Sequence, residues 1–139
     1  MTTQRFGRIV NIGGEAWRNG LPFHTLLAGV GKGSMVGLTV TLAGETVRDG
    51  ITVNCVSPGA VESTADGSPP STICLVRDVS WTGPDVMNEL GRLSGPRYNF
   101  ISRPAHPTEV ASAVAYFGSP EASYVTGQHI GVSGGMVML

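Results

Sequence analysis

The feature that most constrains the fold is a strand–helix–strand unit near the start of the chain. A short apolar run with β-branched residues, GRIVNI at 7–12, predicts a buried strand. Residues 24–48 carry a helical pattern, in which small and apolar side chains recur mostly three or four positions apart: Leu27, Val30, Ser34, Gly37, Leu38, Thr41 and Leu42. A second buried strand, ITVNCVS at 51–57, ends at Pro58-Gly59. Strands joined by a helix pair in parallel through a right-handed crossover, so this order favours an α/β fold.

The rest of the chain repeats this alternation after a long interruption. Periodicity is poor over 60–106, where only a short helix near 83–94 is suggested, and segments of this length are usually lids or binding loops. The run PTEVASAVAYFGS predicts an amphipathic helix near 107–118, and a last strand is expected near 128–132. We therefore predict a three-stranded parallel sheet with helices near 26–48 and 107–118.

Composition narrows the class of protein. The 139 residues suffice for one domain, and 41% hydrophobic against 14% charged residues favours a well-buried core over disorder. A formal net charge of −1 does not indicate a nucleic-acid or anionic-membrane partner. The sequence has no signal-peptide pattern and no apolar run that would span a membrane, so we expect a cytoplasmic protein. Cys55 and Cys74 lack metal-type spacing; Cys55 reads as a small buried side chain, and a disulfide stays open.

The stretch LLAGVGKGSMVGLT at 26–39 contains a lysine among glycines, which raises the alternative of a phosphate-binding loop. Such a loop requires G-x-x-x-x-G-K-[ST] directly after a strand. Here Leu26 stands at the first glycine position, Lys32 is followed by Gly33, and no strand is predicted to run directly into the segment. The sequence does not favour a phosphate loop.

Three segments, in this order, resemble the C-terminal half of a short-chain dehydrogenase/reductase. They are GRIVNIGG, KGSMVGLTVTLAGETVRDGITVNCVSPGAVES and RPAHPTEVASAVAYFGSPEASYVTGQHIGVSGGM. The resemblance implies a partial Rossmann-like, doubly wound parallel sheet made of the three C-terminal strands with flanking helices. It implies that 1–139 is the C-terminal half of an NAD(P)-binding domain, with 60–106 as its variable substrate loop. The family's glycine-rich pyrophosphate turn and its NNAG segment have no counterpart in the sequence.

The resemblance also implies catalytic positions. In this family a tyrosine exchanges a proton with the substrate oxygen, and a lysine one helical turn later lowers the tyrosine pKa and binds the nicotinamide ribose. A phenol with an ordinary pKa of about 10 needs such a nearby positive charge to work near neutral pH. Lys32 matches the lysine, but Ala28 stands at the tyrosine position. The family's serine position falls on Gly13 or Gly14, neither of which offers a hydroxyl.

Two nearby residues are weaker candidates for the missing acid. His24 lies eight residues before Lys32 and titrates in a useful range, but Pro22 argues against a helix that extends so far back. Thr25 stands at the tyrosine position of the family's enoyl-reductase branch, and threonine is a poor acid, so that branch is not favoured.

The turn SPGAVES is the best-preserved functional element. By resemblance, Pro58, Gly59, Val61 and Ser63 would hold the carboxamide of NAD or NADP, together with Lys32 at the ribose. Other conspicuous side chains carry weaker expectations. Trp17 and Trp81 are expected to pack in loops, His106 and His129 have no partners at ligand spacing, and Arg97, Tyr98 and Arg103 are candidates to line a substrate pocket.

The resemblance implies NAD(P)-dependent hydride transfer between a small alcohol and its carbonyl compound. Without the acid and the pyrophosphate turn, we expect the chain to be incomplete and inactive by itself. Two alternatives remain open, a non-catalytic scaffold or oligomerisation subunit and a truncated fragment of a divergent family member. A homo-oligomer or a partner chain is expected in either case, and no metal site is predicted.

Overall fold

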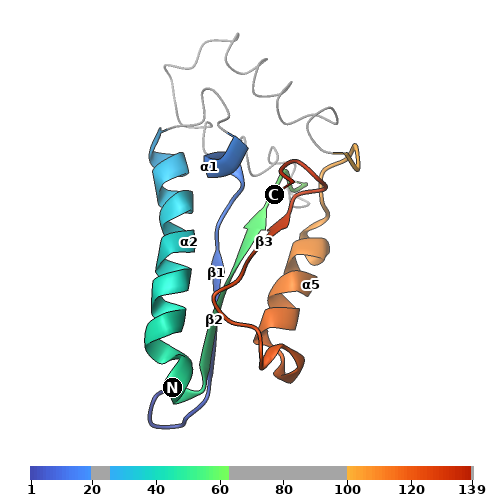
Figure 1. Cartoon of the computed structure of the whole chain (residues 1–139). Coiled ribbons are helices and arrows are strands. Elements are labelled where there is room, and N and C mark those ends of the chain that lie inside the picture. The colour runs from blue at the N-terminus through green and yellow to red at the C-terminus, as the bar shows by residue number, and fades with distance from the viewer. Residues whose placement is uncertain (20–25, 63–99, 139) are drawn as a thin grey trace.

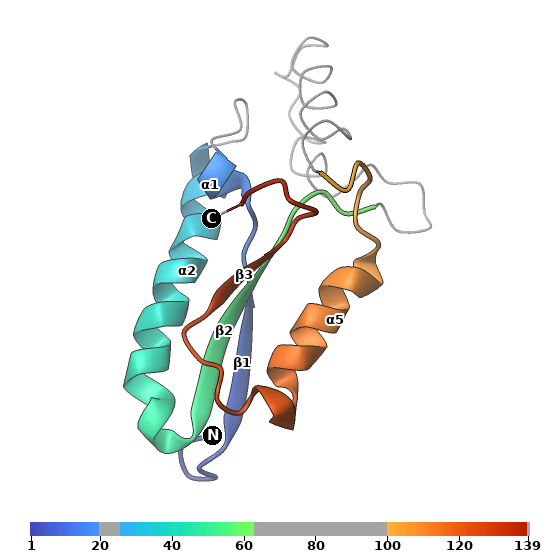
Figure 2. The ribbon, with the colours of Figure 1, turned by 45° about the vertical axis from the view of Figure 1, so that its right-hand side comes forward.

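The fold is a parallel sheet between two helices, and the computed structural model describes residues 1–19, 26–62 and 100–138. The sheet order is β1-β2-β3, with both pairings parallel. Figure 1 shows α2 and α5 on either side of this sheet, and Figure 2 confirms the arrangement from a second direction. The elements run β1 (Gly7–Ile12), α1 (Ala16–Asn19), α2 (Leu26–Thr46), η1 (Val47–Asp49), β2 (Ile51–Pro58), α5 (Pro107–Gly118), η2 (Pro120–Ala122) and β3 (His129–Val132). The predicted three-stranded parallel sheet with flanking helices is confirmed.

The central strand β2 is buried along almost its whole length. Residues 51–57 are all buried, as expected for a strand paired on both sides and covered on both faces. Its first part pairs with β1 from Gly7↔Ile51 onward, and its last part pairs with β3 from Cys55↔His129 onward. Cys55 is a buried free thiol, which agrees with its expected role as a small core side chain.

Side chains alternate along β2 and form a core on each face of the sheet. Toward α2, the buried cluster is Ala43, Ile51 and Val53, with Ile9 and Leu42 packed against it. Toward α5, the buried cluster is Val56, Phe117 and Ala122, with Val10, Val110, Ala113, Val114, Val125, Ile130 and Val132 packed against it. Burial on both faces makes the fold a three-layer helix–sheet–helix arrangement.

Two asparagine side chains hold these layers together through hydrogen bonds. Asn11 donates from Nδ2 to Oγ1 of Thr39 at 2.9 Å, which ties β1 to α2. Asn54 donates from Nδ2 to the carbonyl of Val125 at 2.8 Å and accepts from the Gln128 N–H at 3.1 Å. Asn54 therefore holds the segment that enters β3.

The sequence-based expectations and the structure differ at α1 and α2. Trp17, expected in a loop, lies in the short helix α1, and α2 ends at Thr46, followed by a 3-10 turn. Val30 and Leu38, which contributed to the helical pattern, are 63% and 47% exposed because the buried face of α2 is instead made by Thr39 and Ala43. The suggested helix near 83–94 lies outside the described residues. No helix in the described part of the chain is long and apolar enough to cross a membrane.

The tight turn between η1 and β2 depends on Gly50. Its φ of 72° lies in the left-handed region, and its N–H donates to the Val47 carbonyl at 3.1 Å. A Cβ at this position would also collide with the carbonyl oxygen of Arg5. The turn therefore combines a conformation and a close approach that only glycine satisfies without strain.

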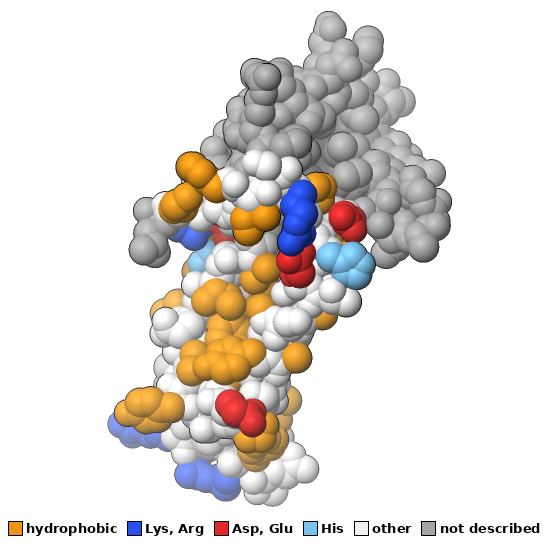
Figure 3. Space-filling view, turned by 90° about the vertical axis from the view of Figure 1, so that its right-hand side faces the viewer, with side chains coloured by type: hydrophobic (Ala, Val, Ile, Leu, Met, Phe, Trp, Pro, Cys, Tyr) orange, Lys and Arg blue, Asp and Glu red, His pale blue; other side chains and the backbone are white. Residues whose placement is uncertain are grey.

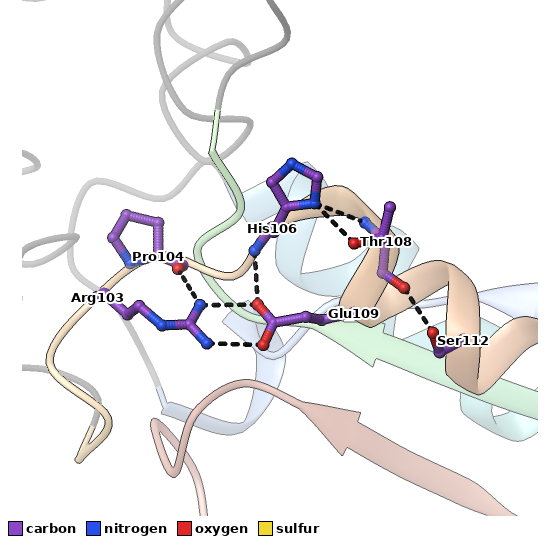
Figure 4. A network of polar contacts seen from close by, with 6 residues as sticks. All are labelled: Arg103, Pro104, His106, Thr108, Glu109 and Ser112. Atoms are coloured by element: carbon purple, nitrogen blue, oxygen red, sulfur yellow. Dashed lines mark hydrogen bonds and ion pairs between the residues drawn. The ribbon is translucent and has the colours of Figure 1, made fainter.

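Helix α5 begins with a network of charge and hydrogen bonds (Figure 4). His106 is the N-cap, and its backbone N–H donates to Oε2 of Glu109 at 2.7 Å. The Arg103 guanidinium donates two bonds of 2.7 Å, one to each oxygen of the same carboxylate. The pKa of Glu109 is lowered to about 2, mainly by the hydrogen bond from Arg103 and next by the hydrogen bond from the His106 N–H. This arrangement is a capping box reinforced by a bidentate ion pair.

We predict that Gly50→Ala destabilises the chain, because alanine must adopt a positive φ and contact the Arg5 carbonyl. The expected loss is about 1–3 kcal/mol, measured by urea denaturation. Gly44→Ala in α2 is the matched control, because a Cβ there meets nothing within 4 Å. A Gly50→Ala variant that unfolds at the wild-type urea concentration would contradict the assignment.

We predict that the benefit of Glu109 depends on pH. Because its folded pKa lies below the ordinary 4.5, its stabilising contribution is present above pH 4.5 and disappears as the pH falls toward 2. Glu109→Gln should therefore lower the urea midpoint at pH 7, and the difference from wild type should shrink near pH 3. Glu45→Gln, at an exposed position of α2, serves as control. A difference that does not change with pH would contradict the role given to the carboxylate.

Candidate functional site

The carboxyl ends of the three parallel strands meet at one edge of the sheet. There β1 runs into Gly13-Gly14, β2 runs into Gly59, and β3 runs into Ser133. Ligands of open α/β sheets bind beyond this edge. The segments that the sequence singled out as functional are therefore brought together where such a site is expected.

Lys32 reaches from α2 to the end of β1. Its Nζ donates to the carbonyl of Ile12 at 3.4 Å, a long hydrogen bond. Gly14 has no Cβ, and a Cβ added there would lie 3.4 Å from both Cγ and Cδ of Lys32. The aliphatic stem therefore packs across the glycine, and the ammonium lies close to the edge of the sheet.

The two glycines after β1 face different surroundings. A Cβ at Gly14 would meet Lys32, whereas a Cβ at Gly13 would collide with Oγ of Ser57 and meet Sγ of Cys55 at 3.0 Å. Gly13 therefore faces the core beside β2, and Gly14 faces the candidate site. Of the two positions that the sequence left open for a serine, only Gly14 lies against the lysine.

The turn after β2 is anchored on both sides. On one side the Gly59 N–H donates to the Val132 carbonyl at 3.0 Å, and Ser133 lies so close that a Cβ on Gly59 would be 2.8 Å from its Cα. On the other side Val61 forms a parallel bridge with Ala105. In this bridge the Ala105 N–H donates to the Ala60 carbonyl and the Glu62 N–H donates to the Ala105 carbonyl. The N–H of Val61, between these two, therefore faces away from Ala105.

Several predicted site residues cannot be placed. His24, Thr25 and Ser63 lie outside the described residues, as do Cys74, Trp81, Arg97 and Tyr98. Ala28 falls in α2, four residues before Lys32, and carries no ionisable group. Among the described candidates, Lys32, Pro58, Gly59 and Val61 do lie along the same edge of the sheet.

Arg103, a candidate to line a substrate pocket, lines a small pocket beside this turn. The pocket is lined by Ala60, Ile101, Arg103, Ala105, Glu109, Val132, Ser133 and Gly134. However, both terminal nitrogens of Arg103 donate to Glu109. The guanidinium therefore has a structural role at the start of α5.

The structure reveals a polar cluster that the sequence did not single out. The side chain of Glu15 is only 1% exposed, and its Oε2 lies 3.6 Å from Nη1 of Arg18. Its Oε1 lies 3.9 Å from Nε2 of His129, which is itself 2.7 Å from Oγ of Ser57. Gly131 makes room for the carboxylate, since a Cβ there would be 2.6 Å from Oε1.

Burial moves both ionisable groups of this cluster toward their neutral forms. Desolvation raises the pKa of Glu15, and the charge of Arg18 opposes that shift. Desolvation also lowers the pKa of His129, and the charge of Arg18 lowers it further. Although the two side chains approach within 4 Å, neither Glu15 oxygen accepts a hydrogen bond from the described residues, and both pKa shifts oppose the charges that an ion pair requires.

This cluster was missed because its partners are distant in the sequence. His129 has no partner at metal-ligand spacing in the sequence, and its partners Ser57 and Glu15 reach it from β2 and from the segment after β1. The available signal was a glutamate directly after a glycine pair at the end of a predicted strand. Trp17 covers the cluster from α1, with its ring centroid 5.9 Å from that of His129. Within the described ranges, no three His, Cys, Asp or Glu side chains are arranged to hold a metal ion.

Comparison with known proteins identifies the family. Residues 1–79 match the family model described as enoyl-(acyl carrier protein) reductase. The chain is 39% identical over its whole length to a 2,3-dihydroxy-2,3-dihydro-p-cumate dehydrogenase of Pseudomonas putida, covering 48% of that protein. It is 34% identical to a 3-oxoacyl-[acyl-carrier-protein] reductase of Vibrio cholerae, again over the whole chain and 49% of the relative. The chain thus spans about half the length of the curated relatives it matches.

Solved structures agree with this assignment. A 3-oxoacyl-[acyl-carrier protein] reductase of Brucella melitensis superposes with a TM-score of 0.76 at 27% identity, over 100% of this chain and 45% of the other. The TT0495 protein of Thermus thermophilus gives a TM-score of 0.74 at 29% identity, over 98% and 51%. Because Thr25 is not described, the expectation against the enoyl-reductase branch remains a prediction. The sequence matches and the similarity of the fold to solved reductases agree, and the chain belongs to the short-chain dehydrogenase/reductase family.

Proposed function

We propose that this chain is the C-terminal half of an NAD(P)-dependent oxidoreductase domain and supplies the nicotinamide end of its cofactor site. The observation that carries the proposal is the position of Lys32, whose stem packs across Gly14 at the carboxyl edge of the sheet. The anchored turn at Gly59 and Val61 lies along the same edge. A cation and a rigid turn of this kind fit the ribose and carboxamide of a nicotinamide nucleotide.

Each candidate residue would have a separate task at the cofactor. Lys32 would donate from Nζ to the ribose hydroxyls, and the outward N–H of Val61 would donate to the carboxamide. Pro58 and Gly59 would fix the turn, with Ser63 as a further donor. When bound, NAD(P) would supply or accept the hydride that converts a small carbonyl compound and its alcohol. The relatives named as dehydrogenase and reductases support this reaction class.

The proposal also assigns a deficiency. Alanine and glycine at 28 and 14 offer no proton donor to a substrate oxygen. Phosphate binding at a glycine-rich turn is also not provided by any segment of the sequence. We therefore propose that this chain alone does not catalyse hydride transfer, and that 60–106 contributes the substrate loop of a longer assembly.

We predict that the isolated chain shows no measurable binding of NAD(H) or NADP(H) at micromolar concentrations in calorimetric titration. Association has to overcome a cost of several kcal/mol, and the contacts to the adenine half are missing. A micromolar dissociation constant would contradict the assigned deficiency.

A second arm tests the position of Lys32 without any cofactor. In Ala28→Tyr/Gly14→Ser, the introduced phenol lies one helical turn from Lys32, so its pKa should fall about one unit below the ordinary value of about 10. The difference in tyrosinate absorbance from the wild-type chain measures this pKa. Adding Lys32→Met should restore the ordinary value. If Lys32→Met leaves the phenol pKa unchanged, the lysine is not placed as proposed.

A second candidate function is a non-catalytic scaffold subunit, and exposed apolar surface favours it. No strand in the described part of the chain pairs with the outer side of β1, where Ile12 is 44% exposed. On α2, Val30, Leu38 and Val40 are 63%, 47% and 56% exposed. Figure 3 shows hydrophobic side chains gathered along the face on the α5 side as well. An open sheet edge beside apolar surface promotes association.

We predict that the purified chain sediments as a dimer or higher oligomer, or is poorly soluble. Leu38→Glu should shift it toward smaller species, because a charge there opposes burial of the exposed face of α2. Glu45→Lys, also at an exposed position of α2, is the control for altered charge. A cooperatively folding monomer at micromolar concentration would contradict the prediction.

A further inference from the structure

We propose that Glu15 and His129 form a buried site that binds a single proton, and that this proton couples the segment after β1 to β3. The inference does not depend on the proposed function, because it concerns side chains beneath the candidate site. Both carboxylate oxygens of Glu15 are buried, and neither accepts a hydrogen bond from any described residue. A buried polar group without a partner is costly, so a native structure that retains one requires an explanation.

The distances leave room for a proton but make no hydrogen bond. Oε1 of Glu15 is 3.9 Å from Nε2 of His129, and Oε2 is 3.6 Å from Nη1 of Arg18. Both are longer than hydrogen bonds. In contrast, Nε2 of His129 lies 2.7 Å from Oγ of Ser57. Ser57 on β2 therefore holds the imidazole of His129 in place. The imidazole faces the Glu15 carboxylate, whose two oxygens accept no hydrogen bond from the described residues.

The groups around the pair come from every neighbouring element. Arg18 on α1 is the nearest cation, Ser57 and Cys55 lie on the adjoining face of β2, and Lys32 from α2 packs against Gly14, the residue before Glu15. With Glu15 ionised and His129 neutral, Glu15 and Arg18 balance in charge. A first proton makes the cluster of Glu15, His129 and Arg18 singly positive. A second proton would leave protonated His129 beside Arg18 with no carboxylate charge to offset either, so the pair binds one proton readily and resists another.

Protonation is coupled to structure because both residues belong to connecting segments. The Glu15 N–H donates to the Pro58 carbonyl at 3.3 Å, and its carbonyl accepts from the Arg18 N–H at 2.9 Å. Trp17, which lies between Glu15 and Arg18 in the sequence, packs close to Gly33 on α2 and beside the His129 ring. A change of charge at the pair therefore acts on α1 and on the glycines at the candidate site.

Trp17 provides the measurement, since a protonated imidazole quenches a neighbouring indole. In a Trp81→Phe background, Trp17 fluorescence should fall as the pH is lowered, in a transition that fits one proton. Glu15→Gln should move the midpoint down by about one pH unit, because the carboxylate that favours proton uptake is gone. His129→Asn should abolish the transition, and His106→Asn, at the exposed N-cap of α5, should leave it unchanged. Far-UV circular dichroism over the same range should stay constant.

Three results would overturn the proposal: an unchanged midpoint in Glu15→Gln, a transition that persists in His129→Asn, or unfolding that accompanies the fluorescence change. If a variant fails to fold, the wild-type chain still decides by nuclear magnetic resonance. The His129 imidazole and the Glu15 carboxyl resonances should then move over the same pH range, as coupled groups do. Independent titrations in separate pH ranges would reject a shared proton.

Discussion

The rest of the structure depends on the burial of β2 between two parallel neighbours. This strand carries core side chains to both faces, pairs with β1 along its first part, and pairs with β3 along its last part. Asn54, inside the strand, also holds the loop that leads into β3. Parallel strands have no short connection available, so α2 and α5 follow from the need to return the chain to the same end of the sheet. The candidate site follows from that arrangement, because the carboxyl ends of all three parallel strands lie at the same edge of the sheet.

In the function proposed above, residues at that edge would hold a ligand, whereas Ala28 and Gly14 offer no proton donor to it. Lys32 and the turn at Gly59 are positioned by packing against glycine and by backbone hydrogen bonds, which do not require the side chains that are absent at 14 and 28. Binding geometry and acid–base chemistry are therefore separable in this fold. Two ionisable side chains, Glu15 and His129, do lie beneath the edge, where they are shielded from water.

Much of this arrangement could be predicted from the sequence, because local patterns determine it. β-branched runs predicted three strands, and the run from Pro107 predicted α5 with its bounds. The resemblance selected Lys32 as a candidate site residue, and the structure places it at the carboxyl edge of the sheet. The pattern failed where neighbours outside the segment decide burial, as for Val30 and Leu38 on α2. The Glu15 cluster could not be predicted, because its contacts span β1, β2 and β3 and appear only when the register between the strands is known.

The absence of a side chain at Gly131 has a consequence for how the sequence can change. Its Cα faces the Glu15 carboxylate so closely that a methyl group there would lie 2.6 Å from Oε1. The space is sufficient for one side chain, supplied either from β3 or from the end of β1. Over evolutionary time the two positions are therefore expected to exchange bulk, with a larger residue at 131 accompanied by a small one at 15. Positions 15 and 131, which look unrelated in one sequence, would thus vary together in side-chain size across many related sequences.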